Sequence, residues 1–271
     1  MLTTETDEST SATWDTARAI LVDASRLESL QRGIEDLLWK IGDESCRRTV
    51  RYTVRYSDGI DHTTSSLAAV TGDLNTDQSE IVGIKVQNYI LHADTFKILA
   101  EINVELGRGL WGGNTVRLQV TATDRAWAAA TRGALRDALR ALLLPYDERS
   151  VTLRAVSIFF LVCAVVIVIT ALPALQAWQA GRQVTAGLLL SPLCMLISAL
   201  SAVAYAPDWI RERLVRWLYP LATFAIGEGK TRYEMSVSRR RTAANVFWVG
   251  VVLALIVGIA AAFVYDRLSG K

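Results

Sequence analysis

The chain of 271 residues has two histidines and three cysteines, the residue types that most often bind metals or carry out nucleophilic and acid–base chemistry. His62 and His92 stand alone in predicted loops, and the cysteines, Cys46, Cys163 and Cys194, are too dispersed for a metal site or a disulfide framework. An enzyme using His62 with nearby carboxylates is a disfavoured hypothesis, because no nucleophile or second histidine stands beside it. We therefore expect no enzymatic activity, no metal and no cofactor.

A glycine-rich segment, GRGLWG at residues 107–112, matches the G-x-G-x-x-G pattern of dinucleotide-binding proteins. That site requires the glycines between a strand and a helix, so that the pyrophosphate meets the helix N-terminus. Here the segment separates two stretches that both alternate like strands. The pattern therefore predicts a hairpin loop.

Basic residues recur on the polar side of the predicted strands. Arg51, Arg55, Lys85 and Arg117 would share one sheet face, where they could hold a small anionic ligand or a partner. The alternative is an ordinary solvated face with cross-strand ion pairs. We do not expect nucleic acid, since residues 1–150 hold 17 Lys/Arg against 22 Asp/Glu, a net charge of −5.

The elements that would position these residues follow from periodicity. Strict alternation predicts strands at about 50–56, 82–86, 96–104 and 116–120, with one apolar and one polar face. Three- and four-residue spacing predicts long helices from Ala17 to Ile41 and from Asp124 to Leu144. We expect a disordered N-terminus at residues 1–12. Residues 13–150 should then form an α+β domain, a four-stranded antiparallel sheet covered on one face by two long helices.

The remaining residues, 151–271, are strongly apolar and carry 12 Lys/Arg against 5 Asp/Glu. Three runs in this part lack charged residues, at 155–181, 183–207 and 242–265. Because about 20 apolar residues suffice to cross a bilayer, these runs predict an all-α membrane region of three transmembrane helices. The expected spans are at about 155–178, 184–206 and 243–265.

The distribution of cations predicts the topology of these spans. The basic loop between spans two and three favours an inner (plasma) membrane protein with a cytoplasmic N-terminal domain and its C-terminus outside. Within that loop, residues 208–219 have the pattern of an amphipathic helix on the lipid surface, with a short helix packed on the domain as the alternative. The expected membrane-surface residues are Arg211, Arg216, Trp217, Arg239, Arg240 and Arg241.

Small residues in the third run predict how the helices associate. Gly250, Ala254, Gly258 and Ala262 repeat at four-residue intervals, which favours close packing between helices, either within one chain or in a homo-oligomer. The sequence thus predicts a non-enzymatic multi-pass membrane sensor or adaptor, coupled to a cytosolic ligand- or partner-binding domain. The alternative is a pore-forming effector triggered through that domain.

Overall fold

The computed structural model describes residues 9–41, 46–94, 97–107, 114–147, 150–151, 217 and 219–269. Its strands are β1 (Thr10–Thr16), β2 (Arg18–Asp23), β3 (Cys46–Tyr56), β4 (Asp61–Thr64), β5 (Ile81–His92), β6 (Ile98–Gly107), β7 (Val116–Ala122), β8 (Leu143–Asp147) and β9 (Ala222–Ala225). Its helices are α1 (Ala24–Leu38), α2 (Leu67–Thr71), α3 (Arg125–Arg140) and α7 (Gly229–Ser269). One compact unit comprises Met1–Glu148 with Pro220–Met235, and a second comprises Arg149–Tyr219 with Ser236–Lys271.

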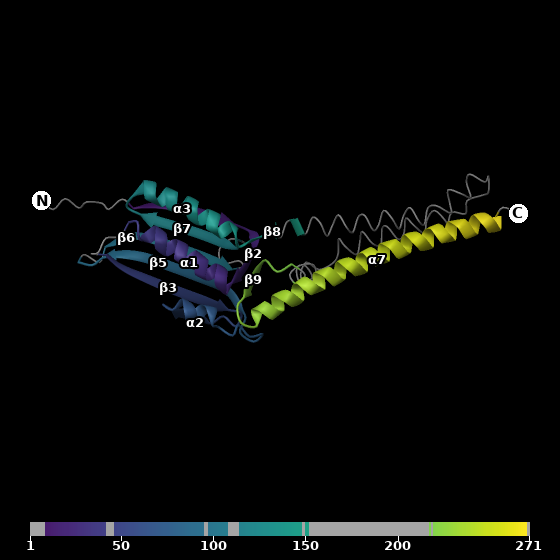
Figure 1. The fold of residues 1–271 in the computed structure, drawn as a ribbon, viewed down its shortest axis with the longest axis horizontal. Helices are drawn as coiled ribbons and strands as arrows, with labels where there is room; N and C mark the ends of the chain where they lie inside the picture. Colours follow the sequence, from purple (N-terminus) through teal and green to yellow (C-terminus); the bar gives the residue numbers. More distant parts are fainter. Residues whose placement is uncertain are drawn as a thin grey trace. The chain divides into compact units, whose positions relative to one another are not determined.

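Six strands of the first unit form one antiparallel sheet in the order β1-β7-β6-β5-β3-β4. Figure 1 labels β7, β6, β5 and β3 of this sheet. Apolar residues alternate with polar ones along the strands, so one face of the sheet is apolar and the other polar. Helices α1 and α3 lie next to each other on the apolar face. The core between the two layers includes Ile34, Leu135, Ile84, Ile102 and Leu118, all almost inaccessible to solvent.

Aspartates fix the starts of the two long helices. The Asp23 carboxylate accepts a hydrogen bond from the Arg26 backbone N–H at 2.9 Å, and Asp124 accepts one from the Ala126 N–H at 2.8 Å. Such N-caps satisfy backbone donors that have no partner within the helix. The predicted first helix was too long, because residues 18–23 form strand β2 and the helix begins only at Ala24.

A second, three-stranded sheet has the order β8-β2-β9. Strand β2 runs antiparallel to β8 and parallel to β9, and Ile20 and Val22 in it are fully buried. The Tyr146 hydroxyl also donates a hydrogen bond to the Pro220 carbonyl at 2.9 Å. The chain therefore leaves this unit through β8 and re-enters it through β9, with both ends held by β2.

A buried asparagine secures the re-entering chain. Asn75 is 2% exposed, and its Nδ2 donates to the carbonyls of Phe224 at 2.9 Å and Ile226 at 3.1 Å. Its Oδ1 accepts from the Ile81 backbone N–H and from Arg232 Nη2, both at 2.8 Å. One side chain thus joins the loop before β5 to β9 and to the start of α7.

The predicted fold class was wrong. In the described residues the architecture is mostly β, with nine strands in two sheets and few helices, where we expected four strands and an all-α membrane region. Five strands were missed: β1, β2, β4, β8 and β9. Strand β1 is rich in Ser and Thr, β2 is a continuous apolar run, and β4, β8 and β9 have only four or five residues each.

The prediction of a multi-pass inner-membrane protein was also wrong. Among the helices in the described part of the chain, none is long and apolar enough to span a bilayer. The predicted third span is not a separate element, because it continues a helix of 41 residues whose first turns carry charges such as Lys230 and Arg232. The other two predicted spans, and residues 208–216, lie outside the described residues. The pore-forming alternative is set aside with the membrane assignment, since it requires the same spans.

Candidate ligand-binding face

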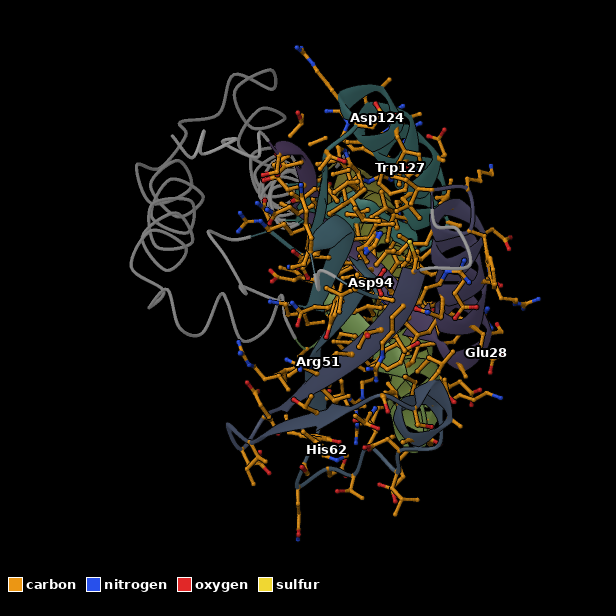
Figure 2. The ribbon with its side chains drawn as sticks, turned by 90° about the vertical axis from the view of Figure 1, so that its left-hand side faces the viewer. Glu28, Arg51, His62, Asp94, Asp124 and Trp127 are labelled. Carbon is orange, nitrogen blue, oxygen red and sulfur yellow. The ribbon has the colours of Figure 1, made fainter. Side chains whose placement is uncertain are left out.

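The polar face of the six-stranded sheet, here called the outer face, carries the four basic residues expected to bind a ligand. Figure 2 shows Arg51 of β3 on the side of the sheet turned away from Glu28 of α1. Residues on one face of a strand alternate, so the remaining outer-face positions follow from the strand register. Lys85 in β5 and Arg117 in β7 occupy such positions, as does Arg55 in β3.

A row of alternating charges crosses this face. The register places Asp15 opposite Arg117, Arg117 opposite Glu105, and Glu105 opposite Lys85. Directly opposed residues in antiparallel strands have Cβ atoms about 5 Å apart, which suits attraction between unlike charges. Each of the two cations in this row therefore lies beside at least one carboxylate, and the row has no net charge.

Arg55 is engaged at the edge of the sheet. Its Nε and Nη2 donate to the two carboxylate oxygens of Asp61 in β4, at 2.9 and 3.1 Å. This two-point contact raises the pKa of Arg55 and lowers the pKa of the exposed Asp61 carboxyl, mainly through the hydrogen bond itself. The geometry gives Arg55 a structural role in joining β3 to β4.

Lys85 is likewise paired, with its Nζ 3.3 Å from Oε1 of Glu105. Glu105 is only 7% exposed although it lies on the polar face. Its Oε2 and the Oδ1 of Asn103 in the next row are shielded from solvent and have no hydrogen-bond partner among the described residues. Buried acceptors normally have partners, so this part of the face has acceptor capacity that the described residues do not use.

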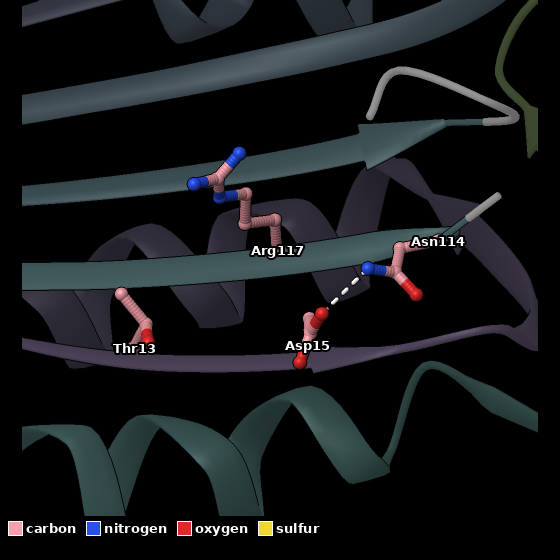
Figure 3. A pocket seen from close by; sticks show the side chains of 4 residues that line it. All are labelled: Thr13, Asp15, Asn114 and Arg117. Carbon is pink, nitrogen blue, oxygen red and sulfur yellow. Dashed lines mark hydrogen bonds between the residues drawn. The ribbon is translucent and has the colours of Figure 1, made fainter. Parts of the chain in front are cut away.

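Arg117 lines a pocket among the described residues. Its side chain, with Thr13 and Asp15 of β1 and Asn114 just before β7, surrounds an open hollow of about 230 Å³ (Figure 3). Asn114 Nδ2 donates a hydrogen bond of 2.5 Å to Asp15 Oδ2, which fixes the carboxylate at the rim. The pocket thus presents one cation, one anion, one amide and one hydroxyl to a common space.

Sequence reasoning found only Arg117 of these four residues. Thr13 and Asp15 were missed because the N-terminal stretch was assigned partly to disorder and no strand was predicted there. A signal was present, since Ala12 and Trp14 alternate with polar residues and pack against the core. Asn114 lies in the loop between β6 and β7, where no periodicity exists to place it.

The other sequence candidates occupy scattered positions. His62 is exposed in β4, and the Nδ1 of His92 at the end of β5 accepts from the Asp94 N–H at 3.3 Å. Cys46 is half-buried in β3. Gly107 ends β6 and the next strand is β7, in line with the hairpin interpretation of the glycine motif. No group of residues suited to a metal occurs in the described ranges.

Several residues predicted to contact lipid or to pack helices lie in the second unit. The guanidinium of Arg239 is 5.1 Å from the centre of the Trp217 ring, and that of Arg240 is 5.5 Å from the Tyr219 ring, both within the range of cation–π attraction. Arg241 lies in α7 and is exposed, as is Gly250, while Arg211 and Arg216 lie outside the described residues. The helix-packing set, Gly250, Ala254, Gly258 and Ala262, falls within α7.

Fold and site together define, in the described residues, a mostly β domain with helices on one sheet face and a polar pocket at the edge of the other. No family model matches the sequence, no curated protein is similar to it, and no solved structure matches the fold. Arguments about function therefore rest on the chemistry of the pocket.

Proposed function

We propose that the domain is a non-enzymatic binding module, and that the pocket lined by Thr13, Asp15, Asn114 and Arg117 takes a small zwitterion. The observation that carries the proposal is the placement of a cation and an anion around one hollow. A ligand with an anionic group at one end and an ammonium group at the other would complement both.

Arg117 supplies the contact for the anionic group. A guanidinium presents several N–H donors in a plane, which matches the oxygens of a carboxylate or phosphate. Asp15 supplies the opposite contact: its Oδ2 accepts from Asn114, and Oδ1 can accept from a ligand ammonium group. A purely anionic ligand would meet repulsion from Asp15, so the pocket favours a zwitterion over a simple anion.

The size and the lining residues of the pocket support ligand binding without catalysis. A volume of about 230 Å³ is below the usual 300–1,000 Å³ of drug-sized sites, so a small ligand is expected. The four lining residues include no histidine, cysteine or lysine, and their one carboxylate, that of Asp15, accepts a hydrogen bond from Asn114.

Thermal unfolding of the full chain with three probes tests the proposal. Phosphoethanolamine should raise the melting temperature most, inorganic phosphate less, and ethanolamine least, because ligands that bind only the folded state stabilise it. Arg117→Gln should remove the response to both phosphates. Asp15→Asn should reduce the response to phosphoethanolamine to that of phosphate.

Arg132→Gln is the matched control, because Arg132 is exposed on α3, which lies on the other face of the sheet. This variant should respond to the probes as the wild type does. The proposal fails if phosphoethanolamine leaves the wild-type melting temperature unchanged, or if Arg117→Gln retains the full response.

A further inference from the structure

Strand β1 is an edge of the six-stranded sheet and lacks most features that protect such edges. It has seven residues, TSATWDT, with one charged side chain and no proline. The opposite edge, β4, has only four residues, and its Asp61 is engaged by Arg55. Natural edge strands are usually short, charged or interrupted, because their unpaired N–H and C=O groups can pair with another chain.

The sequence of β1 complements itself when two copies run antiparallel about its central residue, Thr13. Such a pairing places Thr10 opposite Thr16, Ser11 opposite Asp15, and Ala12 opposite Trp14. The small Ala12 leaves room for the indole of Trp14, and the Ser11 hydroxyl can donate to the Asp15 carboxylate. Each position therefore meets a residue that it fits in size or hydrogen bonding.

The backbone permits the same arrangement. Alternate residues of an edge strand direct N–H and C=O away from the neighbouring strand, here β7. Symmetric pairing about Thr13 joins odd-numbered residues to odd-numbered ones, such as 11 with 15, and even-numbered residues to even-numbered ones, such as 12 with 14. The residues whose N–H and C=O point away from β7 therefore lie opposite each other in the two copies and can form main-chain hydrogen bonds.

We propose that β1 pairs antiparallel with β1 of a second copy of this chain, with the twofold axis at Thr13. Such an isologous contact closes after two copies, because each edge is used once. The two six-stranded sheets then form one continuous sheet of twelve strands, with α1 and α3 of both copies on the same face.

In this dimer the ligand pockets of both copies lie beside the interface between the two β1 strands. Thr13 and Asp15 line the pocket and belong to β1, so Thr13 and Ser11 of the second copy lie beside them on the outer face. The second copy thereby supplies two hydroxyls next to the pocket. The pairing itself rests on β1 alone and does not depend on the ligand-binding proposal.

Cysteine cross-linking of the full chain tests the register. In a background with Cys46→Ala, Cys163→Ala and Cys194→Ala, the variant Thr13→Cys places two thiols at the twofold axis. Directly opposed residues have Cα atoms about 4.5–5.5 Å apart, within disulfide range. Mild oxidation should convert most of the chain to a reducible dimer. Thr63→Cys, at the exposed edge strand β4, is the control and should form little disulfide-linked dimer.

A charge at the axis tests the same contact without a covalent bond. Thr13→Lys sets two ammonium groups against each other and should halve the mass measured by light scattering, to about the 29.8 kDa of one chain. Thr63→Lys should keep the mass of the wild type. A monomeric wild type, an unchanged mass for Thr13→Lys, or equal cross-linking of the two cysteine variants would overturn the proposal.

Discussion

Replacing Asn75 with alanine should destabilise the first compact unit by about 4 kcal/mol. The side chain of Asn75 serves three backbone groups, the carbonyls of Phe224 and Ile226 and the N–H of Ile81. Leaving a buried group unpaired costs about 1–3 kcal/mol, so three groups account for about 3 kcal/mol at the lower limit. Asn75 also has a positive φ of 48°, where alanine costs roughly 1 kcal/mol more.

Urea unfolding at 25 °C, followed by circular dichroism, measures this loss. The variant Asn75→Gly separates the two contributions, because glycine tolerates positive φ but makes none of the side-chain hydrogen bonds. It should be more stable than Asn75→Ala by about 1 kcal/mol and still well below the wild type. A loss under about 1 kcal/mol for Asn75→Ala would refute the reasoning that this side chain secures β9 to the domain.

Three further predictions concern single groups. Because the pKa of Asp61 is lowered in the folded state, its pair with Arg55 stabilises the fold above the carboxyl's ordinary pKa and less as pH falls through the folded value. Urea midpoints of the wild type and Asp61→Asn should therefore converge in acid; a constant gap between them would contradict this. Burial and a hydrogen bond raise the pKa of Tyr56 to about 12, so Tyr56→Phe should remove one late step, near pH 12, of the alkaline absorbance titration at 295 nm. An unaltered titration in Tyr56→Phe would contradict the raised pKa of Tyr56. Gly33→Ala, with open space at its Cβ within α1, should stabilise by up to about 1 kcal/mol. By contrast, Gly229→Ala should destabilise, since its Cβ would lie 2.1 Å from the Phe224 carbonyl oxygen. Calorimetry should give a higher melting temperature than the wild type for Gly33→Ala and a lower one for Gly229→Ala. A shift of both variants in the same direction would contradict the packing argument.

The parts of the fold that sequence could predict are those with regular periodicity. Alternation located segments of β3, β5, β6 and β7, because each has one face in the core and one in solvent. The same reasoning failed at β2. All four residues of its run Ala19-Ile-Leu-Val22 are buried, so side chains on both faces of the strand are apolar and the sequence does not alternate. The prediction therefore included this run in the helix that follows.

The contact that brings the chain back into the domain could not be predicted. Strand β9 is short and lies more than 70 residues beyond β8. It is held by pairing with β2 and by Asn75, whose side chain bonds the backbone carbonyl of Phe224 within it. No periodic pattern marks such a contact. The membrane prediction failed for a related reason: a charge-free run was treated as a separate element, although the structure makes it part of the long helix α7.

The candidate site was predicted only in part. Sequence pattern gave the basic residues of the outer face, but the register decides which of them face carboxylates. Arg55 and Lys85 are paired with Asp61 and Glu105, while Arg117 borders a pocket. The anion of that pocket, Asp15, changes the expected ligand from a simple anion to a zwitterion.

Isothermal titration calorimetry of the full chain with phosphoethanolamine and inorganic phosphate tests the central claim most directly. Comparing both ligands on the wild type and on Asp15→Asn isolates the contact between the ligand ammonium and the carboxylate. We predict that the wild type prefers phosphoethanolamine by about 1 kcal/mol, roughly fivefold in Kd, and that Asp15→Asn loses this preference. Binding of neither ligand to the wild type, or an equal preference in both proteins, would contradict the account.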